Sequence, residues 1–332
     1  MLGLVVSLAA FYFVASEIDF DRLGEAIQQA QWIYIVPCVA LLVAGLVTRG
    51  LRWRLLLNNT LPFKRAFHIM NVAYLVNGVL PLRIGEVARM FLATRADPPV
   101  PIFQTASTII IERLLDLLAV VMLLALALTV GPLPVELQGV GLFMGIVSLS
   151  GFLGAVFLSR RRTLSHSILG FFTERIAFLR RFTLVEWLDQ FLDGLEPLAK
   201  GRTLILALFW TAASWGFSVV AGYVLMYTFY DEASWAVTCL YIAAAAFAIA
   251  VPATVASLGV YEGAIVLALE ALNYGDPHTV AVAFAVTVHF VNVAVHSITG
   301  VIGFISEGIT LEQLSAGVET ARKEMKVGHE PG

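Results

Sequence analysis

Charged residues are scarce in this sequence, and their scarcity excludes an ordinary soluble protein. Asp, Glu, Lys and Arg make up 14% of the 332 residues, whereas hydrophobic residues make up 59%. An average soluble domain carries about 25% charged residues. Together with a mean hydropathy of +0.85, this composition indicates an integral membrane protein.

Motifs for cofactor and metal chemistry are also lacking. The two cysteines, Cys38 and Cys239, lie in separate apolar runs, where cysteine is an ordinary small hydrophobic residue. No CxxC, HExxH, Walker, GxGxxG or GxSxG pattern occurs, so the sequence indicates no metal site, nucleotide site or activated serine. We therefore expect no cofactor, no metal, no nucleic-acid partner and no catalytic residue, and we interpret the protein as not an enzyme.

Long uncharged runs are what the sequence has instead, and about 20 apolar residues suffice to span a membrane. We predict an all-α, polytopic transmembrane bundle of about seven to eight spans, with two proline- or glycine-broken, re-entrant segments near 66–95 and 252–272. A single domain would cover 1–308, with an amphipathic connector near 160–202 and a polar tail at 309–332. The runs without Asp, Glu, Lys or Arg include 1–16, 26–48, 66–82, 117–135, 137–159, 203–230, 233–261 and 277–306.

The placement of basic residues predicts the orientation of the bundle. Five bases and no acid lie between Arg49 and Arg65, and eight bases lie in 160–202, whereas 131–136 and 230–234 contain none. Because Lys and Arg favour cytoplasmic loops, we expect the two basic regions on the cytoplasmic side of a cell membrane. A cytoplasmic C-terminus would then need a further crossing within 259–272.

The first broken segment combines polar residues with backbone breakers. Asn77, Arg83, Glu86 and Arg89 surround Pro81 and Gly85, which predicts a broken helix, because irregular backbone within a membrane is tolerated only where it lines a cavity or is buried in protein. Glu86 lies three residues from each arginine and neutralises at most one of them. The remaining positive charge predicts a phosphate or carboxylate site; the alternative is that the arginines reach the cytoplasmic surface.

The next apolar run contains Glu112, Arg113 and Asp116. Arg113 reaches Asp116 at a spacing of three, so one alternative is a self-contained ion-pair staple. A second alternative is a role in a polar pathway. A third is that the acids balance Arg83 and Arg89 from a neighbouring helix.

The second half of the chain repeats this outline and indicates an internal repeat. A break at Pro252 precedes Gly259, Tyr261 and Glu262, and His289 and Asn292 follow Glu262 by 27 and 30 residues. In the first half, the polar group at 112–116 follows Glu86 by 26 to 30 residues. Paired broken segments point to transporters built from repeats. His289, Asn292 and His296 share one helix face, which predicts a polar seam for interhelical hydrogen bonding, proton handling or substrate contact.

These motifs resemble the lysylphosphatidylglycerol synthase transmembrane-region family, whose members are also described as flippase-like proteins. The resemblance covers nearly the whole chain and implies a polytopic membrane protein. Where the region is fused to a lysyl-transferring domain, it is implicated in moving aminoacylated lipid between leaflets. This chain ends soon after the membrane region, so we do not expect the synthase activity. The matching segments are Leu51-Arg52-Trp53-Arg54, Asn77 to Arg89, Glu112 to Asp116 and Leu258 to Gly263.

The resemblance supports a translocation role for Arg83, Glu86, Arg89, Glu112, Arg113, Asp116 and Glu262. The chain departs from the family pattern at Ala256, Ser257 and Tyr261, where relatives often have a glycine pair and an arginine. We expect an ATP-independent flippase or transporter for a phospholipid or polyprenyl-linked lipid. The alternatives are an intramembrane enzyme that modifies a lipid headgroup, and a scaffold that recruits a separate transferase as its partner.

Overall fold

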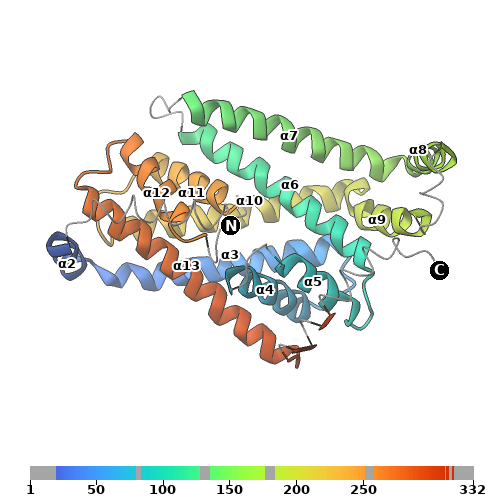
Figure 1. Ribbon diagram of the computed structural model, residues 1–332, viewed down its shortest axis with the longest axis horizontal. Coiled ribbons are helices and arrows are strands. Elements are labelled where there is room, and N and C mark those ends of the chain that lie inside the picture. The colour runs from blue at the N-terminus through green and yellow to red at the C-terminus, as the bar shows by residue number, and fades with distance from the viewer. Residues whose placement is uncertain are drawn as a thin grey trace.

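The computed structural model describes residues 20–79, 84–127, 135–175, 184–250 and 257–310, together with 312–313 and 316–317. The described residues form helices and no strand, which confirms the prediction of an all-α polytopic bundle (Figure 1). The helices are α2 Phe20–Gln29, the 3-10 helix η1 Trp32–Tyr34, α3 Ile35–Leu56, α4 Phe63–Val79, α5 Gly85–Thr94, α6 Ile102–Ala127, α7 Val135–Arg160, α8 Arg162–Arg175, α9 Leu184–Ala199, α10 Gly201–Met226, α11 Trp235–Ala250, α12 Val260–Ala271 and α13 His278–Ser306.

Four described helical stretches are long and apolar enough to cross a membrane: Trp32–Leu56, Leu142–Arg160, Gly201–Met226 and His278–Ser306. Helix α6 has 26 residues, about 39 Å at 1.5 Å per residue, but three charged residues interrupt it. The runs at 66–82 and 233–261 contain the shorter helices α4 and α11, of 17 and 16 residues. At 1.5 Å per residue these are about 25 Å long, less than the roughly 30 Å of hydrocarbon.

Helices α4 and α5 form a hairpin that returns to the end of the bundle from which it entered. Arg65, near the start of α4, donates a hydrogen bond of 2.9 Å to the carbonyl of Arg95, just after α5. Gly85 permits the close packing of the two arms, because a Cβ atom at this position would lie 2.1 Å from the carbonyl oxygen of Ala73. The first broken segment is therefore re-entrant.

Helices α11 and α12 form the corresponding hairpin at the opposite end of the bundle. The hydroxyl of Tyr230, which precedes α11, donates a hydrogen bond of 3.1 Å to the carbonyl of Tyr274, which follows α12. Helix α12 has 12 residues, about 18 Å. The crossing expected within 259–272 is therefore wrong: this segment folds back, and α13 makes the next crossing (Figure 1).

The two halves of the bundle form an inverted repeat. Helices α3 to α6 and α10 to α13 each comprise a long helix, a hairpin and a second long helix. Helices α3 and α10 run antiparallel, since the main chain at Gln31, before α3, bonds that at Thr228, after α10, at 2.9 Å. The contacts are reciprocal: α6 packs against α11, and α13 packs against α4. The two hairpins therefore enter from opposite ends, and each is held by the other half.

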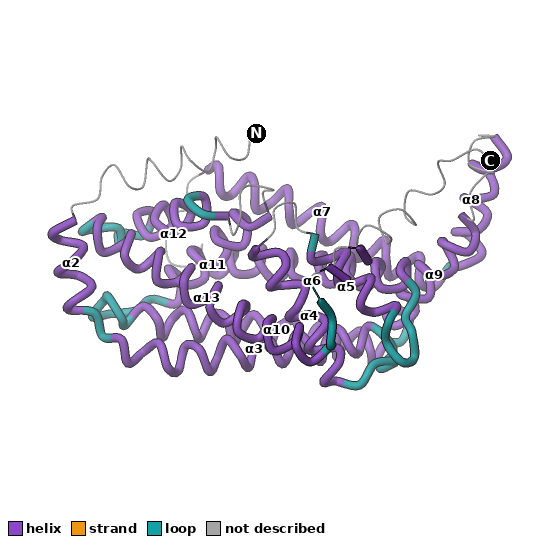
Figure 2. Tube along the Cα trace, turned by 60° about the horizontal axis from the view of Figure 1, so that its bottom comes forward, coloured by secondary structure: helices purple, strands orange, loops and turns teal. Residues whose placement is uncertain are grey.

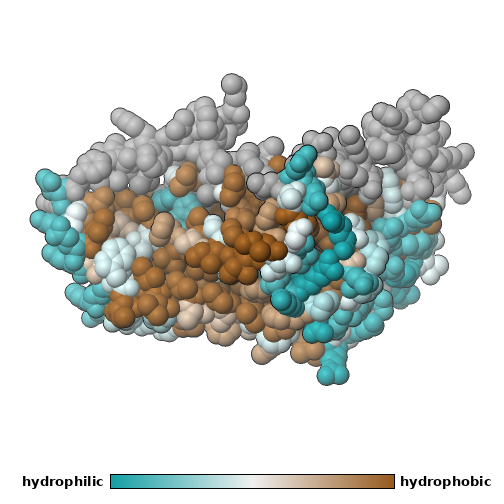
Figure 3. All heavy atoms as spheres, turned by 90° about the horizontal axis from the view of Figure 1, so that it is seen from below, coloured by the Kyte–Doolittle hydropathy of each residue, from teal (hydrophilic) through white to brown (hydrophobic). Residues whose placement is uncertain are grey.

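Polar segments lie at the two ends of this bundle, and an apolar belt lies between them (Figure 3). Helix α2 lies at one end, and α8 and α9 lie at the other (Figure 2). The end that carries α8 and α9 also carries the basic residues Arg54, Lys64, Arg95 and Arg160. The described apolar core comprises three buried clusters: one around α10 to α13, one around α3 to α5 and one around α6, α7 and α9.

Candidate functional site

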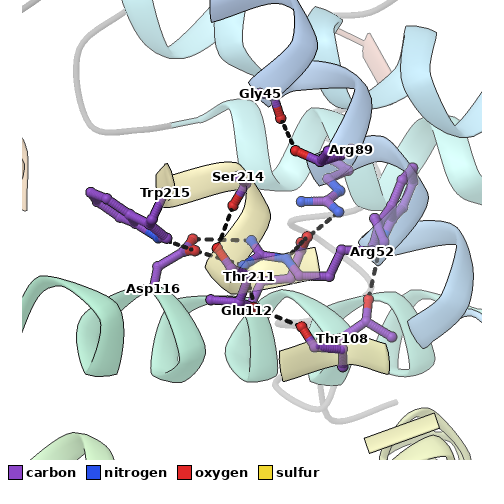
Figure 4. Close-up of polar contacts among 12 residues, drawn as sticks. Gly45, Arg52, Arg89, Thr108, Glu112, Asp116, Thr211, Ser214 and Trp215 are labelled. Atoms are coloured by element: carbon purple, nitrogen blue, oxygen red, sulfur yellow. Dashed lines mark hydrogen bonds and ion pairs between the residues drawn. The ribbon is translucent and has the colours of Figure 1, made fainter. Parts of the chain in front are cut away.

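An arginine buried inside the bundle joins α3, α6 and α10. Arg52 is 1% exposed, and its guanidinium binds both carboxylate oxygens of Asp116, at 2.7 and 3.2 Å. It also donates to the hydroxyl of Thr211 at 3.0 Å, and the indole of Trp215 donates to Asp116 at 3.1 Å (Figure 4). This bidentate geometry gives the strongest kind of charge-assisted hydrogen bonding.

Glu112, one helical turn before Asp116, connects a second buried arginine to the first. Its carboxylate lies 2.6 Å from the guanidinium of Arg89 on α5 and 3.5 Å from Nε of Arg52 (Figure 4). The guanidinium of Arg89 also lies over the ring of Trp53, with its carbon 3.9 Å from the ring centre. Glu112 thus holds the returning arm of the first hairpin against α3 and α6.

The tip of the first hairpin is fixed by a third ion pair. Glu86 pairs with Arg113 on α6, and it accepts a hydrogen bond from the amide of Asn77 at 3.2 Å. Asn77 in turn accepts the main-chain N–H of Gly85 at 2.8 Å. The self-contained pairing of Arg113 with Asp116 is therefore not the arrangement found. Arg83 and Pro81 lie outside the described residues.

The charges of this cluster balance within the described part of the chain. Three arginines (Arg52, Arg89 and Arg113) face three carboxylates (Glu86, Glu112 and Asp116). A buried ion pair that loses one partner typically destabilises a protein by about 3–5 kcal/mol, because the other charge is left without compensation. The described cluster is therefore a neutral network and not the open anion site that the sequence suggested for Arg89.

The second hairpin carries a simpler polar pair at the corresponding place. One carboxylate oxygen of Glu262 lies 2.6 Å from Nδ1 of His289 on α13, and the other accepts the main-chain N–H of Gly259 at 2.7 Å. The ring of Tyr261 lies 4.5 Å from that of His289. Gly259 has φ of +83°, a conformation that favours glycine. Pro252 lies outside the described residues.

The two tip pairs occupy equivalent positions in the inverted repeat. Arg113 follows Glu86 by 27 residues, and His289 follows Glu262 by 27 residues. Three residues further along each long helix, the first half has Asp116 and the second has Asn292. The spacing seen in the sequence thus corresponds to two hairpin tips, each joined to the following long helix, but the second half carries less charge.

Asn292 faces a cavity at the junction of α3, α10 and α13. The cavity has a volume of about 40 Å³, room for about one or two water molecules. Arg49, Ser218, Asn292 and His296 provide its polar lining. The amide nitrogen of Asn292 donates one of its two hydrogens to the carbonyl of Val288 at 2.8 Å, so its second N–H can serve a ligand.

Sequence reasoning missed Arg49 and Arg52, because it assigned both to a basic loop. Helix α3 instead continues to Leu56, so both arginines lie within it. A signal was present: no proline and no polar loop sequence separates the apolar run at 26–48 from Arg49 and Arg52. Their spacing of three places them on neighbouring positions of one helix face.

A comparison with known protein families shows to which family the chain belongs. The sequence profile of the lysylphosphatidylglycerol synthase TM region matches residues 1–300. The chain belongs to this family. All of the site residues described above lie within the matched range, so the polar network and both hairpins are parts of the lysylphosphatidylglycerol synthase TM region. The family places the chain among membrane proteins with a lipid-related function. No curated protein and no solved structure matches the chain.

Proposed function

We propose that this chain moves a phospholipid, or another lipid-linked anionic headgroup, between the leaflets of a cell membrane without ATP. The membership in the lysylphosphatidylglycerol synthase TM region family supports a lipid substrate. The cytoplasmic side would be the end that carries α8 and α9, because basic residues gather there and Lys and Arg favour cytoplasmic segments. The protein would act as a transporter and not as an enzyme.

The inverted pair of re-entrant hairpins is the observation that carries this proposal. Transporters built from inverted repeats place broken helices and polar residues near the bilayer midplane and alternate access by moving one repeat against the other. Here a polar pair, Glu86–Arg113 or Glu262–His289, joins the described part of each hairpin to the next long helix. Breaking one pair at a time would open the bundle first to one side and then to the other.

The buried network around Arg52 would serve as the fixed part of this mechanism. It joins α3, α6 and α10, and Glu112 attaches α5 to it. Several kcal/mol would be needed to separate these charges in a low-dielectric interior. The returning arm α5 would therefore stay in place while the hairpin tip moves.

Leaflet exchange of fluorescent phospholipids in proteoliposomes tests the proposal. We expect wild-type protein to accelerate exchange without ATP, and Glu86→Gln and Glu262→Gln variants to change the rate while remaining monodisperse. An Asp189→Asn variant is the matched control, because Asp189 belongs to a surface pair with His166 in which both side chains are more than a third exposed. No exchange with any anionic, zwitterionic or polyprenyl-linked lipid would refute the proposal. A chemically modified lipid in the same vesicles would identify an enzyme instead.

A further inference from the structure

Arg49 differs from Arg52 and Arg89, which each form an ion pair with a carboxylate of α6. It lies in α3 three residues before Arg52 and is half-buried. No carboxylate within the described ranges forms an ion pair with Arg49, and its guanidinium carbon lies 5.6 Å from the centre of the Trp215 ring. An arginine inside a membrane span normally has a partner or marks a substrate pathway.

The cavity beside Arg49 has the polar groups that an oxygen-rich anion requires. Arg49 offers guanidinium donors from α3, and His296 contributes an imidazole from α13. The hydroxyl of Ser218 on α10 also lines the cavity and donates to the carbonyl of Ser214 at 3.1 Å. The residues that line the cavity include no Asp or Glu. Asp116, whose charge acts on Arg49 from beyond ion-pair distance, is already bound by Arg52. The lining itself therefore carries positive charge and no carboxylate, which favours a phosphate group.

The inverted repeat explains why Arg49 is left without a partner. In the first half, Asp116 neutralises Arg52. The equivalent residue in the second half is Asn292, which lines the same cavity as Arg49 and carries no charge. Trp215 lies between the Arg52–Asp116 pair and the cavity, because its indole N–H donates to Asp116 while its ring faces Arg49.

We infer that Arg49, with Asn292 on the facing helix, binds the phosphate of the transported lipid headgroup. This inference rests on the proposed function and names the contact through which the lipid is recognised. With room for about one or two waters, the cavity of about 40 Å³ is too small for a phospholipid headgroup. The headgroup enters when α13 moves away from α3 and α10, and the uncompensated charge of Arg49 draws the phosphate into the opening.

Binding of short-chain lipids to the purified full-length chain in non-ionic detergent tests the inference directly. The probes are dihexanoyl phosphatidylglycerol, the uncharged dihexanoylglycerol that lacks phosphate, and inorganic phosphate. We expect only the phospholipid to bind. The Arg49→Gln variant should bind it about 10- to 100-fold more weakly, as expected for the loss of charge-assisted hydrogen bonds worth about 1.5–3 kcal/mol. An Arg202→Gln variant, at an exposed position in the first turn of α10, should bind as wild type does.

Two further variants separate recognition from a merely structural role of Arg49. Arg49→Lys keeps the charge and should retain part of the affinity. Asn292→Asp leaves Arg49 in place but adds a carboxylate to the cavity, and it should weaken binding as strongly as Arg49→Gln. Binding by Arg49→Gln or Asn292→Asp within twofold of wild type would overturn the inference. Equal binding of the uncharged lipid would also overturn it, and binding of inorganic phosphate alone would overturn the assignment to a lipid.

The exchange assay distinguishes failure of this inference from failure of the proposed function. If wild-type protein exchanges lipid and Arg49→Gln exchanges it at the same rate, the role of Arg49 is refuted and the proposed function stands. If phospholipid binding depends on Arg49 but wild-type protein exchanges no lipid, the binding site stands and the proposed function is refuted.

Discussion

The ion pair between Arg52 and Asp116 makes a quantitative prediction about stability. In an Asp116→Asn variant, Arg52 keeps its hydrogen bond to Thr211 but has no carboxylate nearer than Glu112, at 3.5 Å. Glu112 also has to neutralise Arg89. Two unit charges about 4 Å apart attract by about 4 kcal/mol at an effective dielectric constant of 20. Removing one partner of a buried pair typically costs about 3–5 kcal/mol. We therefore expect Asp116→Asn to lower the free energy of unfolding by about 3–5 kcal/mol.

A double-mutant cycle shows whether this loss comes from the pair itself. The cycle consists of Arg52→Met, Asp116→Leu and the variant with both substitutions. Replacing both partners removes the uncompensated charge, and such replacements are often neutral for stability. The double variant should therefore be more stable than either single variant. Unfolding in mixed micelles with increasing fractions of denaturing detergent measures these free energies.

The surface pair of His166 and Asp189 provides the control for this cycle. Its atoms are 3.0 Å apart, but both side chains are more than a third exposed, and such pairs contribute about 0–1 kcal/mol. Asp189→Asn should therefore change the free energy of unfolding by less than about 1 kcal/mol. The reasoning would be refuted if Asp116→Asn were no more destabilising than Asp189→Asn, or if the effects of the two single substitutions at Arg52 and Asp116 simply added.

Three other predictions test the hairpins. Gly259→Ala should lower the free energy of unfolding by about 1–3 kcal/mol, because alanine is strained at φ of +83°. Gly85→Ala should lower the melting temperature, since its Cβ would meet a main-chain oxygen of α4. Gly78→Ala is the control and should not lower it, because no atom lies within 4 Å of the added Cβ. Equal effects of the two substitutions would contradict the packing of the hairpin. Cysteines introduced at Arg95 and Asn273 should react with an impermeant maleimide from opposite sides of the membrane, and labelling of both from one side would contradict the inverted arrangement.

The arrangement of the hairpins was largely predictable from the sequence. Charge-free runs indicate α7, α10 and α13, whereas α3 and α6 extend through charged residues that the runs exclude. The backbone breakers near Gly85 and Gly259 locate the re-entrant segments. The repeat was visible as an equal spacing of 27 residues from Glu86 to Arg113 and from Glu262 to His289. Such features are local or periodic, and hydrophobic periodicity and breakers are what a single sequence records best.

The pairing of the charges was not predictable, because it depends on contacts between distant segments. The sequence assigns Arg52 to a basic loop. Its partner Asp116 lies 64 residues later in the chain, and only the fold brings the two together. Arg113 has Asp116 three residues away in sequence, yet it contacts Glu86 on another helix. Helical spacing allows Arg113 to pair with Asp116. The fold of the first hairpin instead places Glu86 beside Arg113.

One difference between the repeats decides which arginine of α3 is available to a ligand. Arg52 and Arg49 lie one helical turn apart on α3. Arg52 contacts Asp116 on α6 of the first half, and Arg49 lines a cavity with Asn292, the equivalent residue on α13 of the second half. Asp116 neutralises Arg52 and makes it structural, whereas Asn292 leaves Arg49 uncompensated beside a cavity. A carboxylate in place of Asn292 would give Arg49 the same kind of partner that Arg52 has. The Asn292→Asp substitution is therefore the sharpest test of the proposed headgroup site, because it removes no group that holds the fold together.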